Sequence, residues 1–282
     1  MSTGDQGQTL GQIMFYRQLE PLSMERHRAL GVSQVSNPFS FLADTHLVPL
    51  TVDEFGLAAV CYPIIFDTQS RTPLAVMGLR PGMNVFVEAD GSLDPEVYLP
   101  AFARRYPFLP IIAGSGQQQP AQPAEGEGER VVVCIDRSAK MISASPELAF
   151  FEGDKPSKYT QDAIQFCREF DLLARRTQEF VRLMEQHGLF ELTPLAIPVA
   201  NPDGSRGEQR IGEYLRISDQ KLNGLPKEVY LDLRDRGVSA VMHAHLLSLG
   251  LWPKILSRAA RIQASTPLGG GGAPLGGTQA AF

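Results

Sequence analysis

The chain has 282 residues, of which 43% are hydrophobic and 20% are charged, an ordinary balance for a globular protein that is long enough to bury a large core. Its formal net charge of -5 argues against a general nucleic-acid-binding protein, because such proteins neutralise several phosphates with clustered Lys and Arg. The same charge disfavours an anionic membrane surface as a partner.

The three cysteines, Cys61, Cys134 and Cys167, cannot all pair within one chain, and each has mostly apolar neighbours. This pattern favours buried, reduced thiols in a reducing compartment. Residues 1–14 lack the basic and apolar regions of a classical secretory signal, and every apolar run is shorter than the roughly 18 residues of a membrane span. We therefore expect a disordered segment at 1–14, no membrane insertion and a cytoplasmic location.

Residues 39–112 are divided by prolines and glycines into short segments rich in β-branched and aromatic side chains. Such segments predict strands joined by turns, here at residues 46–50, 60–66, 74–79 and 85–88. The dipeptide Asp90-Gly91 predicts a hairpin turn after the last of them, because it tolerates a positive φ.

A helix is predicted at residues 95–106, where Pro95 suits the first turn and apolar side chains can share one face. Pro100 lies inside this segment and predicts either a kink or a later helix start.

Residues 114–129 are rich in Gly, Gln, Pro and Glu and almost free of large apolar groups, which predicts a flexible insertion. Residues 130–136 then predict a strand with apolar side chains on both faces. Such a strand is typical of the centre of a sheet, so the insertion is expected to be a surface loop within one sheet domain.

Residues 160–187 carry apolar side chains at spacings of three and four, which predicts a long amphipathic helix that Gly188 ends. The remaining predicted elements are strands at 192–199 and 210–217, helices at 218–222 and 226–236, and a last helix at 239–261 that is broken near 250–253.

Together these elements predict an α+β fold. Its mainly antiparallel sheet comes chiefly from residues 46–136, the helices after residue 160 pack on the sheet, and a small strand pair lies at 192–217. We expect a single domain at 15–262 and a disordered Gly/Pro-rich tail at 263–282.

The segment from Tyr98 to Pro110 joins three prolines, four aromatic residues and two adjacent arginines. Guanidinium groups bind carboxylates, phosphates and sugar acids, and aromatic rings offer a wall for a peptide or a sugar ring. The predicted ligand-binding residues are therefore Tyr98, Phe102, Arg104, Arg105, Tyr106 and Phe108.

Adjacent residues on a helix diverge by about 100°, so Arg104 and Arg105 are not expected to face one pocket together. The alternative interpretation of the pair is structural. One arginine would then pair with a buried acid such as Asp136 or Glu54, and the other would be solvated.

The His243-Ala244-His245 segment invites a metal hypothesis in which Asp232 or Asp235 supplies a third ligand. On a helix, residues two apart point about 200° away from each other, so both imidazoles could reach one ion only in a strand. The surrounding sequence favours a helix. We therefore predict no metal site and expect packed or capped histidines.

Other polar features have weaker functional interpretations. Tyr16 and Arg17 predict an extended arm, and the basic segment at 25–28 is either a solvated face or the docking site of a partner. No sequence feature lowers the pKa of a cysteine thiol, so core packing is expected for the cysteines. Gly-rich phosphate loops, nucleophile elbows, Cys-x-x-Cys pairs and His-Glu-x-x-His helices do not occur in the sequence, and no cofactor is predicted.

Several short motifs resemble a bacterial family called SapC, over roughly residues 15–256. The segments that carry the resemblance are Val48-Pro49-Leu50, Tyr62-Pro63-Ile64-Ile65-Phe66, Asn84-Val85-Phe86-Val87, Tyr98 to Phe108, and His245-Leu246-Leu247-Ser248-Leu249. The resemblance implies an association with the bacterial surface layer, without an assigned reaction or catalytic residues.

We therefore expect a non-catalytic binding or accessory protein whose partner is a protein or a small acidic or aromatic ligand. The alternative is an enzyme that modifies a peptide, a sugar or a small acid, with Arg104 or Arg105 as the substrate anchor.

Overall fold

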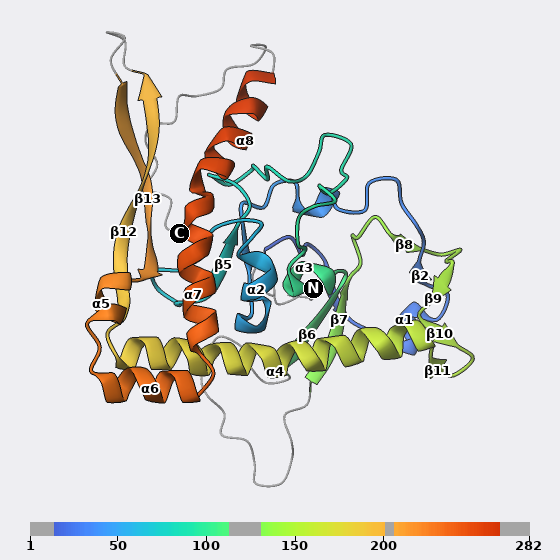
Figure 1. Cartoon of the computed structure of the whole chain (residues 1–282). Helices are drawn as coiled ribbons and strands as arrows, with labels where there is room; N and C mark the ends of the chain where they lie inside the picture. The colour runs from blue at the N-terminus through green and yellow to red at the C-terminus, as the bar shows by residue number, and fades with distance from the viewer. Residues whose placement is uncertain (1–13, 113–130, 201–205, 266–282) are drawn as a thin grey trace, which may run out of the picture. The chain divides into compact units, whose positions relative to one another are not determined.

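The computed structural model describes residues 14–112, 131–200 and 206–265 (Figure 1). These residues fall into two compact units. Unit 1 comprises Met1–Thr45, Val87–Ser92 and Phe102–Leu172, and unit 2 comprises His46–Phe86, Leu93–Ala101 and Leu173–Phe282. The single domain expected at 15–262 stays a prediction. The insertion predicted at 114–129 lies outside the described residues, as do the two predicted disordered ends apart from Met14 and residues 263–265.

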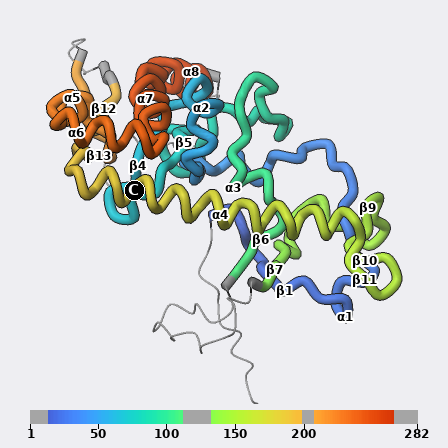
Figure 2. Tube along the Cα trace, turned by 60° about the horizontal axis from the view of Figure 1, so that its bottom comes forward, coloured from blue at the N-terminus to red at the C-terminus, as the bar shows by residue number. Residues whose placement is uncertain are grey.

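Unit 1 is built on a three-stranded antiparallel sheet in the order β1-β7-β6. Figure 2 shows its strands side by side; they are β1 (Leu19–Pro21), β6 (Phe108–Ile112) and β7 (Val131–Asp136). The central place of β7 confirms the prediction that was made from its two apolar faces. The smaller strand groups are β8 (Ile142–Ser143), β2 (Gly31–Val32) and β9 (Leu148–Ala149) in one sheet, and β10 (Phe151–Glu152) with β11 (Lys155–Pro156) in another.

The core of unit 1 lies between these strands and the first half of a long helix. Its buried members are Leu30, Val32, Phe108, Ile135, Phe150 and Cys167. Gly31 allows β2 to fit between its two neighbours, because a Cβ at this position would lie 2.1 Å from the carbonyl oxygen of Leu148. The short helical turns α1 (Met24–His27) and η1 (Ser40–Leu42) connect the strands.

The long helix is α4 (Lys158–Gln186), which confirms the helix predicted at 160–187. Its residues up to Leu172 belong to unit 1 and the remainder to unit 2. Gly188 ends the helix with a φ of 62°, and its amide donates to the carbonyl of Glu185 at 2.9 Å. Glycine adopts a positive φ after a helix with less strain than other residues, which explains why the sequence predicts this boundary correctly.

Unit 2 contains a five-stranded antiparallel sheet in the order β12-β13-β4-β5-β3. Its strands are β3 (Leu47–Pro49), β4 (Ile64–Phe66), β5 (Pro73–Val76), β12 (Phe190–Ala200) and β13 (Arg206–Ile217). The hairpin of β12 and β13 is the long arm seen in Figure 1, and it joins the sheet where Leu215 pairs with Phe66.

The helices of unit 2 that come after α4 follow the predicted order, whereas the two short helical segments at residues 52–58 were not predicted. The helices of this unit are η2 (Val52–Glu54), α2 (Phe55–Ala58), α5 (Asp219–Asn223), α6 (Lys227–Asp235), α7 (Ser239–Ser248), η3 (Leu249–Leu251) and α8 (Trp252–Ser265). The hydroxyl of Ser218 accepts a hydrogen bond from the amide of Lys221 and so caps α5 as expected. No helix among residues 14–112, 131–200 and 206–265 is long and apolar enough to cross a bilayer.

The α+β class is confirmed, but the predicted arrangement of strands is wrong in one respect. Residues 46–136 do not build one sheet, because β3, β4 and β5 belong to the sheet of unit 2 whereas β6 and β7 belong to that of unit 1. The hairpin at 190–217 is correspondingly not a separate pair, since it extends the unit 2 sheet. Strand pairing between distant segments is not encoded in local periodicity.

One further local prediction is wrong. Residues 85–86 form a turn, so no strand spans 85–88, although the bond from the Glu88 amide to the Ser92 carbonyl at 2.8 Å confirms the turn at Asp90-Gly91. The helix predicted at 95–106 is shorter than expected, since α3 (Ala101–Arg104) begins at residue 101, which confirms the later start predicted from Pro100. Its start follows Pro100, and a buried carboxylate from η2 accepts the hydrogen bond of the first helical amide.

Candidate functional site

An aromatic cluster in unit 1 gathers rings from segments that are far apart in the sequence. Its members are Phe15, Tyr16, Phe41, Phe102 and Tyr106. The rings of Phe41 and Tyr106 are stacked, with centroids 4.1 Å apart and an interplanar angle of 19°. Phe15 meets Phe41, Phe102 and Tyr106 edge to face at centroid distances between 5.0 and 5.7 Å. This geometry makes the cluster a rigid apolar wall.

Arg105 lies behind this wall and is only 7% exposed. Its guanidinium carbon is 4.0 Å from the ring centroid of Phe102 and 4.6 Å from that of Phe170. Arg104 is exposed, with its guanidinium carbon 5.5 Å from the ring centroid of Phe166. The two arginines therefore lie in different environments, and Arg105, which is buried, packs against aromatic faces.

Asp136, which the structural interpretation offered as a partner for an arginine, is fully buried and bonded to other donors. One carboxylate oxygen accepts from the amides of Gln18 and Ser138 and from the Ser138 hydroxyl, at 3.1, 3.0 and 2.6 Å. The other oxygen accepts from the amide of Arg17 at 3.0 Å and faces the hydroxyl of Tyr106 at 3.4 Å. Burial opposes ionisation, yet these hydrogen bonds together hold the pKa of Asp136 below its ordinary value.

Tyr106 connects this buried carboxylate to the aromatic wall. Burial raises the pKa of its phenol, and the negative charge of Asp136 raises it further. The positive charge of Arg17 acts in the opposite direction on the pKa of the same phenol, with a smaller effect. Tyr106 is therefore a neutral phenol at physiological pH.

A pocket of about 420 Å³ opens in front of the wall, and we call it the aromatic pocket. Phe15, Phe41 and Tyr106 form its apolar side. Its charged lining residues are the exposed side chains of Arg17, Lys140 and Asp44, so that two cations face one carboxylate. Ser40 and Ser138 add hydroxyl groups that can donate or accept hydrogen bonds.

The structure brings together only part of the predicted set of ligand-binding residues. Tyr106 lines the aromatic pocket, Phe102 belongs to the aromatic wall without lining the pocket, and Arg105 packs against Phe102. Phe108 lies in the core of unit 1 against Phe150, and its carbonyl accepts the hydroxyl of Tyr16 at 2.9 Å. Tyr98 belongs to unit 2, where its hydroxyl donates to Glu54.

Sequence reasoning missed most residues of the aromatic pocket. Phe41 lies in η1 shortly after Pro38, and Lys140 lies in a turn after β7, so neither stands in a recognisable motif. Arg17 was noted only as part of an arm, and its neighbour Phe15 was not singled out. The adjacent Phe15-Tyr16-Arg17 segment was the one signal that could have led to the pocket.

The two histidines of α7 lie in different environments. His243 is exposed and His245 is fully buried on opposite faces of α7, as a helix requires. Among the residues that the structure describes, no three His, Cys, Asp or Glu side chains are grouped to hold a metal ion. Burial raises the pKa of the Cys167 thiol to about 11, which leaves it protonated and unreactive.

A family model described as SapC matches residues 22–255, which confirms the resemblance seen in the sequence motifs. No curated protein and no solved structure matches the chain.

Proposed function

We propose that this chain, which belongs to the SapC family, is a non-catalytic binding or accessory protein whose ligand site is the aromatic pocket of unit 1. The observation that carries the proposal is the stacked pair of Phe41 and Tyr106 beside the cationic side chains of Arg17 and Lys140. An apolar wall with a few converging polar groups is the usual form of a small-molecule site.

The ligand expected from this lining is a small anion that carries a flat apolar group. The flat group would cover the edge of the aromatic wall, where ring contacts favour offset or edge-to-face packing. A carboxylate or a phosphate would lie between Arg17 and Lys140, because a guanidinium binds such oxyanions through paired N–H donors. The Tyr106 phenol can donate a further hydrogen bond, since its raised pKa keeps it protonated.

The hydrogen bonds of Asp136 and the position of Arg105 support binding over catalysis. A general base needs an accessible site for the proton that it removes. The carboxylate of Asp136 already accepts several hydrogen bonds, and its low pKa makes it a weak base. Arg105, one of the two anchors in the enzyme alternative, packs against two phenyl rings and does not line the aromatic pocket. These features favour a site that holds its ligand without transforming it.

The experiment is a calorimetric titration of the purified full chain with aromatic carboxylates and phosphates. We expect binding by the intact chain and at least a tenfold weaker affinity for Phe41→Ala and for Arg17→Gln, since tenfold corresponds to about 1.4 kcal/mol. Arg28→Gln is the matched control, because Arg28 is an exposed arginine of the same unit that pairs with Asp154 outside the pocket. Turnover of any titrated compound by the intact chain would reject the non-catalytic assignment.

Two further parts of the proposal concern where the protein acts. The link to the bacterial surface layer rests on what the family name implies, and the cytoplasmic location is proposed from the three free cysteines, which favour a reducing compartment. Cell fractionation followed by cross-linking tests both. Recovery in the cytoplasmic fraction, cross-linked to a surface-layer subunit, would support an accessory role before export. Recovery without such a partner would remove the surface-layer link.

A further inference from the structure

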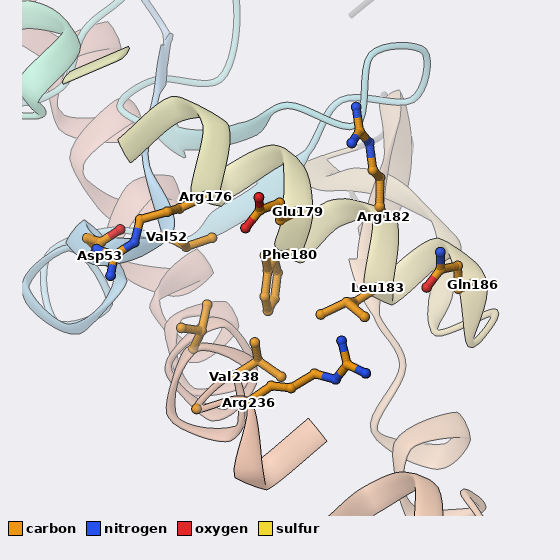
Figure 3. Close-up of a pocket in the computed structure, with 12 residues that line it drawn as sticks. Val52, Asp53, Arg176, Glu179, Phe180, Arg182, Leu183, Gln186, Arg236 and Val238 are labelled. Carbon is orange, nitrogen blue, oxygen red and sulfur yellow. Dashed lines mark hydrogen bonds and ion pairs between the residues drawn. The ribbon is translucent and has the colours of Figure 1, made fainter. Parts of the chain in front are cut away.

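Unit 2 contains a second pocket, of about 550 Å³, which the proposed function does not use. It lies between the second half of α4, the start of η2 and the turn that leads into α7 (Figure 3). We call it the α4–α7 pocket. All of its lining residues belong to unit 2, so it is independent of the aromatic pocket.

The floor of the α4–α7 pocket is an apolar strip. Phe180 is 2% exposed and points from α4 toward Val238, with Leu183 beside it in Figure 3. Val52 and Val241 extend the strip at its edges. A strip of this kind accommodates methylene groups, because their burial removes apolar surface from water.

One side of the strip has two carboxylates, Asp53 and Glu179, and one guanidinium, Arg176, whereas the side chain of Arg182, which also lines the pocket, points away from the Phe180 ring in Figure 3. Arg176 pairs with Asp53 at 3.0 Å, so these two charges largely offset each other. The carboxylate of Glu179 lies on the same side of the Phe180 ring in Figure 3, and it forms no ion pair with any of the described residues. This side of the pocket therefore favours a cationic group.

The other side presents a positioned guanidinium. In Figure 3 the side chain of Arg236 runs below Leu183, on the opposite side of the Phe180 ring from Glu179. Its Nε donates to the carboxylate of Asp232 at 2.7 Å, one turn earlier in the chain. That bond holds the guanidinium in place through a single nitrogen, and the terminal amino groups of Arg236 remain available to an anion.

We infer that the α4–α7 pocket binds a linear zwitterion, with an ammonium group at Glu179, a carboxylate at Arg236 and an apolar spacer over Phe180 and Leu183. A free ω-amino acid and the C-terminal lysine of a peptide share this chemistry. Both charged groups are needed for full complementarity, because each side of the pocket would repel the opposite arrangement.

The test compares three probes of matched length, which are aminohexanoate, hexanoate and hexylamine, titrated into the full chain by calorimetry. We expect the zwitterion to bind at least tenfold more tightly than either singly charged probe. In Glu179→Gln, aminohexanoate should no longer bind more tightly than hexanoate. In Arg236→Gln, aminohexanoate should no longer bind more tightly than hexylamine. Equal affinities for the three probes, or no binding of aminohexanoate, would overturn the inference.

Matched controls separate a specific site from a general charge effect. Arg234→Gln changes an exposed arginine that is also ion-paired, to Asp235, but does not line the pocket, so it should leave all three affinities unchanged. If Arg234→Gln and Arg236→Gln lower the affinity for aminohexanoate equally, the binding is a non-specific charge effect and the inference is wrong. Arg17→Gln in unit 1 should have no effect, which keeps this result distinct from failure of the aromatic pocket. A peptide that ends in lysine, compared with the same peptide carrying a C-terminal amide, distinguishes the two sources of the zwitterion.

Discussion

The hydroxyl of Tyr98 donates a hydrogen bond to the buried carboxylate of Glu54, with 2.9 Å between the two oxygens. The same carboxylate accepts from the amide and the hydroxyl of Thr51, at 2.8 and 2.9 Å, and from the amide of Ala101 at 2.6 Å. Glu54 thus closes its own capping box and also binds the first amide of α3. The Tyr98 side chain, predicted to bind ligand, is therefore part of a structural network within unit 2.

Replacing Glu54 should destabilise the protein strongly. Glu54→Gln keeps the shape but turns one acceptor oxygen into a donor that faces other donors, so we expect a loss of about 1 to 3 kcal/mol in the free energy of unfolding. Tyr98→Phe should cost about 1 kcal/mol, because it removes one hydrogen bond from the network. Urea unfolding measures both. The exposed Glu96→Gln serves as the control, and a loss equal to that of Glu54→Gln would contradict the assignment.

The two adjacent arginines should differ in their effect on stability. Arg105→Ala removes a buried side chain that packs on Phe102 and Phe170, so we expect a loss of about 2 to 4 kcal/mol. Arg104→Ala should change stability by less than about 0.5 kcal/mol, since its side chain is exposed. Thermal unfolding of the two variants checks this order. Equal shifts would show that the contacts of Arg105 with the two rings contribute nothing.

Asp136 should stabilise unit 1 at neutral pH and lose this contribution in acid. Its folded pKa lies below the ordinary value of 3.8, so the stabilisation is complete above that pH and disappears as the pH falls through the lower folded pKa. We expect Asp136→Asn to cost about 2 to 3 kcal/mol at pH 7 and progressively less as the pH falls below 3.8. Asp154→Asn, an exposed acid of the same unit, is the control. If the loss of stability caused by Asp136→Asn does not change with pH, the negative charge of Asp136 does not contribute to stability.

His245 should make unit 2 sensitive to mild acid. Burial lowers its pKa from 6.5 to about 3, and its Nε2 accepts a hydrogen bond from the amide of Ile217 at 3.0 Å, which requires the neutral ring. Below pH 6.5, His245 becomes protonated in the unfolded chain but stays neutral in the folded chain. Stability should therefore fall by up to about 1.4 kcal/mol per pH unit as the pH drops from 6.5 toward 3.

The test follows urea midpoints between pH 7 and pH 4. His245→Gln preserves an acceptor for the Ile217 amide but cannot titrate, so we expect a flatter pH profile even where the variant is less stable at pH 7. His243→Gln changes the exposed histidine of the same helix and should retain the profile of the intact chain. A profile that does not change in His245→Gln would assign the acid sensitivity to other groups.

Local sequence signals predicted the elements whose formation depends on near neighbours. The spacing of apolar residues in α4 and the glycine at its end both act within a few residues, so the predicted and observed bounds agree within two residues. The two apolar faces of β7 likewise indicated its central position. The helix predicted at 95–106 starts only after Pro100, one of the two alternatives that the sequence predicted, and local periodicity does not reveal that Glu54 accepts the hydrogen bond of its first amide.

The aromatic pocket was only partly predictable for the same reason. Tyr106 stood out by composition, but the residues that give the pocket its charge come from other segments. The bond from the Arg17 amide to Asp136 joins residues 119 positions apart, and no motif connects Lys140 to either of them. Tyr98 and Phe108 belong to the same predicted aromatic and arginine segment. In the structure, however, Tyr98 bonds to the buried Glu54 and Phe108 packs in the core of unit 1.

The most direct test of the ligand site is a calorimetric comparison of naphthoate with its neutral isostere, naphthamide, on the intact chain, on the double variant Arg17→Gln/Lys140→Gln and on Arg28→Gln. If the aromatic pocket binds a flat anion, naphthoate will bind the intact chain and Arg28→Gln at least tenfold more tightly than naphthamide, and the double variant will lose that preference. An unchanged preference in the double variant, or equal binding of both compounds to the intact chain, would contradict the proposed site.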